Sequence, residues 1–264
     1  MQAESNWLLL LSYDGTRYHG WQVQPTQTTI EGTIEAALLK LTGKQIKVHG
    51  AGRTDAGVQA LNHTACFSCV SYFSPEKWRD ALNAVLPDDL VIKCVQKVPQ
   101  DFHARHSAIG KRYRYLVFNL PYKNPFAEKK SWWVPRRLEL GAIREAAAEL
   151  TGTHDFSAFR ASGCTSPNPV KELREISIDE ERRLHATLCF ELEANSFLQH
   201  MVRILAGTLV ETGLGKIRPS SVKTILESRN RNNAGPTAPA HGLYVLQVRY
   251  PEGLVYWPDE VIDR

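Results

Sequence analysis

The sequence predicts an α/β fold of the α+β class, built from two ferredoxin-like halves. Strand-forming and helix-forming segments follow the order β-α-β-β-α-β in residues 1–105, and the same order recurs in residues 106–264. The chain has 264 residues, which exceeds the roughly 100–200 residues usual for one domain. The halves share no obvious sequence identity, so the repeat is one of pattern. We therefore predict two domains, 1–105 and 106–264.

The first half contains the clearer helix signals. Thr28 and Glu31 are spaced as a capping box before an apolar helical face, and Gly43 ends that helix. Ser74, followed by Pro75, starts a second helix. The predicted strands of this half are Trp7–Tyr13, Ile46–Ala51, His63–Val70 and Leu90–Val98.

The second half repeats the order with weaker boundaries. Leu138–Leu150 is predicted to be a helix, and Asn195 or Ser196 is predicted to cap a helix that carries Phe197 and ends at Gly213. A further helix starts at Pro219. The predicted strands are Lys111–Phe118, Arg174–Asp179, His185–Ala194 and Gly242–Tyr250.

Composition excludes several classes of protein. The apolar run Trp7–Leu11 is too short to span a bilayer, and residues 1–6 lack the features of a signal peptide. Five cysteines form a sparse, odd set, typical of reduced thiols. We therefore expect a cytoplasmic protein with no membrane partner. The net charge of +4 permits an anionic partner without requiring one.

A glycine-rich loop lies between two predicted strands. Residues 49–60 read His-Gly-Ala-Gly-Arg-Thr-Asp-Ala-Gly-Val-Gln-Ala. Val58-Gln59 stands where a P-loop needs Lys-Ser/Thr, and no third glycine follows at the dinucleotide-binding spacing. What remains is a sharply bent backbone that displays Arg53 and Asp55. Arg53 could keep the carboxylate ionised and bind phosphate; alternatively, Asp55 only closes a turn.

A basic, aromatic segment runs from Lys97 to Arg137. It holds ten Lys and Arg against two acids, a net charge of +8, whereas the rest of the chain holds 22 against 26, a net charge of −4. Eight aromatic residues are interleaved with these cations. Cations for phosphates and rings for unstacked bases are typical of an RNA-binding surface. The alternative is a solvated strand face in which Tyr113 and Tyr115 belong to the core.

The cysteines give little support to a metal site. Cys66 and Cys69 form a C-x-x-C motif with His63 nearby, but no second paired motif supplies the remaining ligands. On a strand, the two thiols point to opposite faces. We expect buried thiols and no bound metal.

Several ordered motifs resemble the tRNA pseudouridine synthase A (TruA) family over nearly the whole chain. They include the loop Ala51-Gly52-Arg53-Thr54-Asp55-Ala56-Gly57-Val58. The others are Tyr13-Asp14-Gly15-Thr16, Tyr18-His19-Gly20-Trp21-Gln22, Asp101-Phe102-His103-Ala104-Arg105, Lys111-Arg112-Tyr113-Arg114-Tyr115, His154-Asp155-Phe156, Phe197-Leu198-Gln199-His200-Met201-Val202-Arg203 and Gly242-Leu243-Tyr244. One departure is Gln59, which stands where the family commonly has His.

The resemblance implies an isomerase that converts uridine to pseudouridine at positions 38, 39 and 40 of the tRNA anticodon stem-loop, as a homodimer without cofactor or metal. It implies a pseudouridine synthase fold of two ferredoxin-like halves around a central basic cleft. It also implies that Asp55 is the nucleophile and that Tyr113 packs on the target base. The alternatives are a synthase for another RNA or tRNA position and a non-catalytic RNA-binding module.

The remaining candidate residues surround this chemistry. Arg203 lies on an otherwise apolar helix, and we expect it either to form an ion pair with Asp55 or to be an exposed helix arginine. A carboxylate at Asp55 could attack C6 of the base or C1′ of the ribose, and Tyr113 is a candidate general base. The candidate RNA-backbone set is Arg53, His103, Arg105, Lys111, Arg112 and Arg114.

Overall fold

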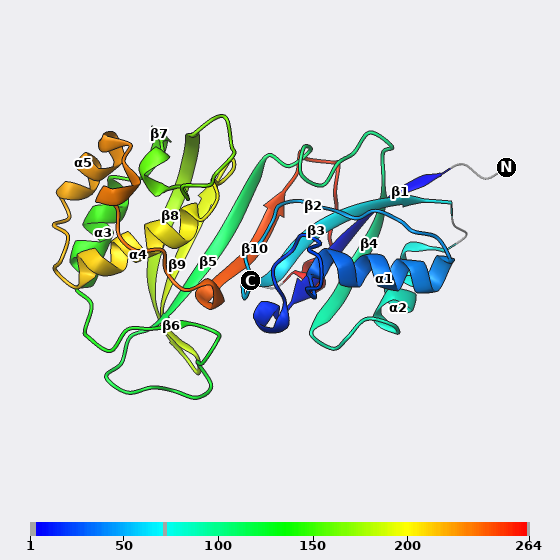
Figure 1. The fold of residues 1–264 in the computed structure, drawn as a ribbon, viewed down its shortest axis with the longest axis horizontal. Coiled ribbons are helices and arrows are strands. Elements are labelled where there is room, and N and C mark those ends of the chain that lie inside the picture. The colour runs from blue at the N-terminus through cyan, green and yellow to red at the C-terminus, as the bar shows by residue number, and fades with distance from the viewer. Residues whose placement is uncertain (1–3, 71–72, 263–264) are drawn as a thin grey trace. The chain divides into compact units, whose positions relative to one another are not determined.

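The computed structural model describes residues 4–70 and 73–262. It confirms the predicted mixed α/β class (Figure 1). The chain forms two compact units, one of residues 1–109 with 245–264 and the other of residues 110–244. This division differs from the predicted bounds 1–105 and 106–264, because the C-terminal segment joins the first unit. There, the Asn62 side chain donates to the Leu246 carbonyl, and the Ile109 N–H donates to the Arg249 carbonyl.

The first unit is an antiparallel sheet with two helices beside it (Figure 1). Its strands lie in the order β4-β1-β3, and β10 follows β3. β1 is buried on both faces along its continuous apolar run, Trp7–Leu11. The bounds are β1 Ser5–Tyr13, α1 Ile30–Thr42, β2 His49–Gly50, β3 Gln59–Cys69, α2 Pro75–Asn83, β4 Leu90–Val98 and β10 Leu243–Arg249.

α2 packs on one face of this sheet through aromatic residues. The Trp78 ring on α2 lies 6.3 Å from the Trp7 ring and 5.2 Å from the Phe67 ring. Cys66 is next to Phe67 on β3 and therefore points to the other face. On that face the Cys66 Sγ accepts a hydrogen bond from the Ala104 N–H.

The second unit has strands in the order β5-β9-β8-β7, with the short β6 parallel to the end of β5. α3 and α4 pack against each other, and α3 also contacts β8. The bounds are β5 Gly110–Phe118, β6 Trp132–Trp133, α3 Leu140–Ala148, β7 Gly152–Asp155, β8 Val170–Arg183, β9 Ala186–Ala194, α4 Met201–Gly213 and α5 Ser221–Ser228.

Two predicted helix starts are wrong for local reasons. The α1 cap is Thr29, whose side chain accepts from the Gly32 N–H, and not Thr28. Glu31 closes no capping box; it accepts instead from the Val23 N–H at 2.8 Å. α4 starts at Met201 and not after Asn195 or Ser196, because His200 has a left-handed backbone with φ of 62°.

The observed strand bounds differ from the predicted ones where pairing with a neighbouring strand sets the length. The predicted strand Ile46–Ala51 is reduced to His49–Gly50, whereas Arg174–Asp179 extends to Val170–Arg183 along β9. β6 and β7 were not predicted, since two to four residues carry no readable periodicity. Leu90–Val98 was predicted with the observed bounds.

Candidate active site

The loop of residues 51–58, here called the Asp55 loop, joins β2 to β3 in the first unit. Asp55 is half-buried, and its neighbours Arg53 and Ala56 are exposed. The Val58 N–H donates to the Asp55 carbonyl at 3.2 Å, which closes a tight turn. Gly57 has φ of +81°, a conformation that residues with a Cβ rarely adopt. The backbone therefore presents Asp55 at the tip of a short connection.

A separate segment, residues 13–21, holds the Asp55 loop in place. The Trp21 N–H donates to the Thr54 carbonyl at 3.0 Å, and the Tyr13 hydroxyl bonds to the Thr54 Oγ1 at 3.0 Å. Gly20 makes this close approach possible. Any other residue at this position would place its Cβ only 2.5 Å from the Thr54 carbonyl oxygen, and the φ of +86° also favours glycine. These contacts to Thr54, the residue before Asp55, preorganise the loop.

Gln59, the first residue of β3, hydrogen-bonds both to the segment of residues 13–21 and to the Asp55 loop. It is 2% exposed, its Oε1 accepts from the Gly15 N–H at 3.1 Å, and its Nε2 donates to the Gly57 carbonyl at 3.3 Å. The Nε2 also donates to the Thr16 hydroxyl at 3.3 Å. The departure noted in the sequence thus has a structural role: the buried amide links Gly15 to the end of the Asp55 loop.

We predict that Gln59→Ala lowers the free energy of unfolding by about 1–3 kcal/mol, because the buried Gly15 N–H loses its acceptor. For the activity that the sequence resemblance implies, turnover should fall more than tRNA affinity, since the loop loses its support while the expected RNA-binding residues remain. Urea denaturation and single-turnover kinetics measure the two effects. Gln24→Ala, a change at an exposed glutamine, is the matched control. Equal behaviour of the two variants would contradict a positioning role for Gln59.

Tyr113 lies on β5 in the second unit, and its surroundings differ from those of Tyr115. The Tyr113 ring is half-buried and stands edge-on to Phe197, with ring centroids 5.0 Å apart. Tyr115 is fully buried, and its hydroxyl donates to the Pro239 carbonyl at 2.7 Å. Burial raises the pKa of Tyr115 well above its usual range. The core alternative therefore holds for Tyr115, whereas Tyr113 keeps part of its surface in solvent.

Arg112 and Arg114 lie on the other face of β5 and are paired with acids. Arg114 donates to Glu191 of β9 through Nε at 2.8 Å and also through Nη2. Arg112 lies 2.8 Å from Glu191 and 3.7 Å from Glu175. Arg114 is 8% exposed. A phosphate would have to displace these carboxylates, so we leave both arginines out of the proposed RNA-binding set.

The other candidate residues are divided between the two units. Arg53, His103 and Arg105 are in the first unit, where both arginines are exposed and His103 is half-buried. Lys111 and Arg203 are half-buried in the second unit, and the Arg203 Nε donates to the Ala238 carbonyl at 2.8 Å. The expected ion pair of Arg203 with Asp55 joins different units and stays a prediction.

The comparison with known families decides the assignment. A family model described as tRNA pseudouridine synthase matches residues 10–107 and 146–251. The chain belongs to this family. It is therefore an isomerase that forms pseudouridine from uridine in tRNA. The first matched range contains the Asp55 loop and Gln59, and the second contains Arg203; Tyr113 lies between the two ranges.

Curated relatives support the same family over most of the chain. A tRNA pseudouridine synthase A of Acetivibrio thermocellus is 45% identical over 242 residues, covering 92% of this chain and 98% of the relative. A protein of that name from Thermoanaerobacter sp. is 41% identical over 245 residues, covering 93% and 99%. One from Myxococcus xanthus is 43% identical, covering 93% and 92%.

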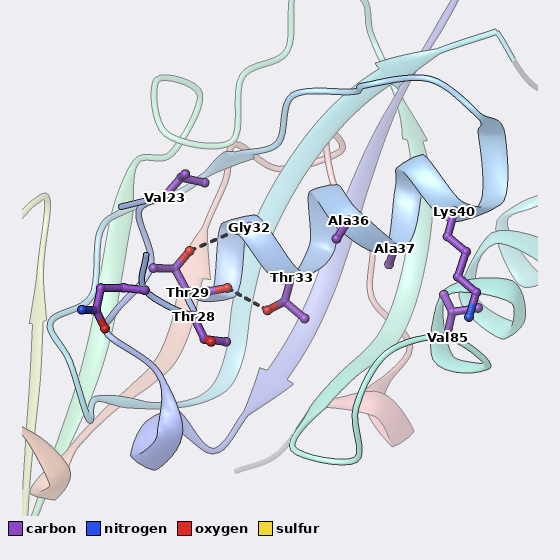
Figure 2. A pocket seen from close by; sticks show the side chains of 10 residues that line it. Val23, Thr28, Thr29, Gly32, Thr33, Ala36, Ala37, Lys40 and Val85 are labelled. Carbon is purple, nitrogen blue, oxygen red and sulfur yellow. Dashed lines mark hydrogen bonds between the residues drawn. The ribbon is translucent and has the colours of Figure 1, made fainter. Parts of the chain in front are cut away.

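A hollow of about 460 Å³ lies along α1 (Figure 2), and no residue of the Asp55 loop lines it. Threonine, alanine and glycine residues line most of it, with Lys40 and Val85 at one end. It offers no carboxylate or imidazole for the chemistry of this synthase family. Among the described residues, no helix is long and apolar enough to cross a membrane.

Sequence reasoning missed four residues that shape the sites. Gln59 was noticed only as a departure, and Glu191 lies far from its arginines in sequence. His49 and His106 flank His103 with ring centroids 5.2 and 4.4 Å from it. A signal for the histidines was present, since His49 lies two residues before the loop and His106 follows Arg105.

The five cysteines are free thiols, and Cys66, Cys69 and Cys189 are buried.

Proposed function

We propose that the chain converts uridine to pseudouridine at positions 38, 39 and 40 of the tRNA anticodon stem-loop, with Asp55 as the nucleophile. The observation that carries the proposal is the Asp55 loop itself. It presents a half-buried carboxylate on a backbone that hydrogen bonds hold from both sides. The position within tRNA comes from the resemblance of the ordered motifs to the TruA family. A homodimer in the cytoplasm belongs to the same proposal.

The reaction balances without an added reactant. The N1–C1′ glycosidic bond breaks, the uracil turns, C5 joins C1′, and the C5 proton leaves while N1 gains one. The Asp55 carboxylate forms a temporary covalent bond either to C6 of the base or to C1′ of the ribose, and so keeps hold of one fragment while the other turns.

The target base must leave its stack to reach a carboxylate. Flipping a base costs a few kcal/mol, and stacking on an aromatic ring returns about 1–3 kcal/mol. Tyr113 fits this role because its ring is half-buried and braced by Phe197. We also propose its hydroxyl as the base that removes the C5 proton.

Exposed rings and cations in the second unit support an RNA partner. In the loop of residues 119–131, Tyr122 and Phe126 are 62% and 66% exposed. Lys123 Nζ lies 5.0 Å from the centroid of the Trp133 ring. Exposed rings can stack on bases, and nearby lysines can bind phosphates. Together with the exposed Arg53 and Arg105 and the half-buried His103 and Lys111, these residues form the proposed RNA-contacting set.

One assay tests the reaction and its position. Unmodified tRNA with tritium at C5 of uridine is incubated with the protein, the released tritium is counted, and the product positions are mapped. Release with pseudouridine at positions 38–40 is the expected result. Release with product elsewhere would favour a synthase of different specificity. Tight tRNA binding without release would favour a non-catalytic RNA-binding module and contradict the proposal.

For Tyr113, we predict that removing the hydroxyl and removing the ring have different effects. Tyr113→Phe should keep tRNA affinity and lower turnover by about 100-fold or more, because the base is lost while stacking remains. Tyr113→Ala should also weaken binding by roughly 5- to 100-fold. Filter binding and tritium release separate the two. Tyr256→Phe, at a ring 76% exposed, is the control. Full activity of Tyr113→Phe would exclude the hydroxyl role.

A further inference from the structure

Three histidines and an arginine gather beside the Asp55 loop in the first unit. The His103 ring lies 4.4 Å from the His106 ring and 5.2 Å from the His49 ring, measured between centroids. His49 and His106 are exposed, His103 is half-buried, and Arg105 between them is exposed. His49 and Gly50 form β2, which leads directly into residue 51 of the loop.

The backbone that carries this cluster is fixed to β3. The Ala104 N–H donates to the Cys66 Sγ at 3.3 Å, and the Tyr250 hydroxyl donates to the Ala104 carbonyl at 2.8 Å. His49 lies directly opposite Cys66 in the pairing of β2 with β3. The same residue of β3 therefore positions both segments of the cluster, although they lie more than fifty positions apart in the sequence. They meet on the sheet face that α2 does not cover.

A hydrogen bond selects one tautomer of the neutral His103 ring. Its Nδ1 accepts from the Arg105 N–H at 3.1 Å, which leaves the ring proton on Nε2. Burial, followed by the nearby His106, His49 and Arg105, lowers the pKa of His103. His103 therefore offers its Nε2–H as a donor, flanked by a permanent cation and two exposed imidazoles.

The cluster is suited to an anion. The ionisable groups that act most strongly on His103 are all cationic when protonated. An anion would relieve their mutual repulsion and favour the charged forms of the exposed imidazoles. A metal ion is a poorer fit, since no group of three or more His, Cys, Asp and Glu among the described residues could hold one.

We propose that His49, His103, Arg105 and His106 bind a phosphodiester group of the RNA, and that the exposed histidines take up protons on binding. The inference rests on the proposed function in taking the anion to be RNA. A phosphodiester remains singly negative near neutral pH, so the proton taken up belongs to the protein. The sign follows from linkage: binding that is coupled to proton uptake becomes weaker as the pH rises.

The test measures the dissociation constant of unmodified tRNA at constant ionic strength at about pH 6 and about pH 8. For the unsubstituted protein we expect binding at least about fivefold weaker at the higher pH. His49→Gln with His106→Gln should reduce this ratio to less than about twofold. His185→Gln, at a half-buried histidine in the turn between β8 and β9, is the control and should leave the ratio unchanged.

A variant with permanent positive charges at both histidine positions distinguishes loss of charge from loss of folding. His49→Lys with His106→Lys should bind tRNA at the higher pH as tightly as the unsubstituted protein does at the lower pH. Retention of the full pH dependence by the glutamine variant would overturn the inference, as would weak binding by a folded lysine variant. Tritium release, measured on the unsubstituted protein, is a separate readout. pH-dependent binding without pseudouridine formation would overturn the proposed function alone.

Discussion

Asp55→Asn is expected to lower tritium release by about three orders of magnitude or more, because the amide cannot form the covalent bond to base or ribose. Binding of tRNA should change by less than about twofold, since one oxygen is replaced by a group of the same size. The hydrogen bonds that hold the Asp55 loop join Thr54, the Asp55 backbone and Gly57. They should survive the substitution.

The control for Asp55→Asn is the same chemical change at the exposed Asp88. Asp88→Asn should leave both release and binding unchanged. If Asp55→Asn retained more than about a tenth of the activity, the nucleophile assignment would fail. If it lost tRNA binding together with activity, the carboxylate would have a role in RNA positioning instead.

Glu191→Ala should have the largest effect on stability among the surface and sheet positions discussed. The carboxylate serves Arg112 and Arg114 together, and the Glu191 and Arg114 side chains are 13% and 10% exposed. Removing it leaves two guanidinium groups side by side with little water to solvate them. Breaking such a pair by deleting one partner costs about 3–5 kcal/mol. Urea denaturation measures the free energy of unfolding.

Glu175→Ala is the matched control because Glu175 touches the same cluster from β8 but is 52% exposed. An exposed pair contributes about 0–1 kcal/mol, so this variant should unfold nearly as the unsubstituted protein does. Equal losses for the two glutamates would contradict the role of burial. A loss below about 1 kcal/mol for Glu191→Ala would show that the arginines find other partners.

Local patterns predicted most of the secondary structure. The alternation of apolar residues placed β4 with its observed bounds, and the predicted start at Ser74 is the observed cap of α2, which accepts from the Lys77 N–H. Local patterns gave a wrong helix start where two adjacent residues are equally suited to cap the helix. Thr28 and Thr29 are both good caps, and only the path of the preceding chain selects Thr29 for α1.

Charge counting along the chain overstated how many cations of the basic segment are unpaired, for a related reason. The segment from Lys97 to Arg137 carries a net charge of +8, but Arg112 and Arg114 are ion-paired with Glu191, far outside it. Tyr113 and Tyr115 share a strand face in the sequence pattern, yet only Tyr115 is fully buried. Burial depends on what packs over a face, and alternation identifies only the face.

The sequence by itself determined the order of the longer elements, the α/β class and the residues of the Asp55 loop, because periodicity, caps and short motifs depend on neighbours within a few positions. The tertiary structure alone decided which cations are ion-paired, which tyrosine is buried and which histidines meet. It also moved residues 245–264 into the first unit. These outcomes depend on pairing between β-strands distant in the chain, and no local pattern records the identity of a distant partner.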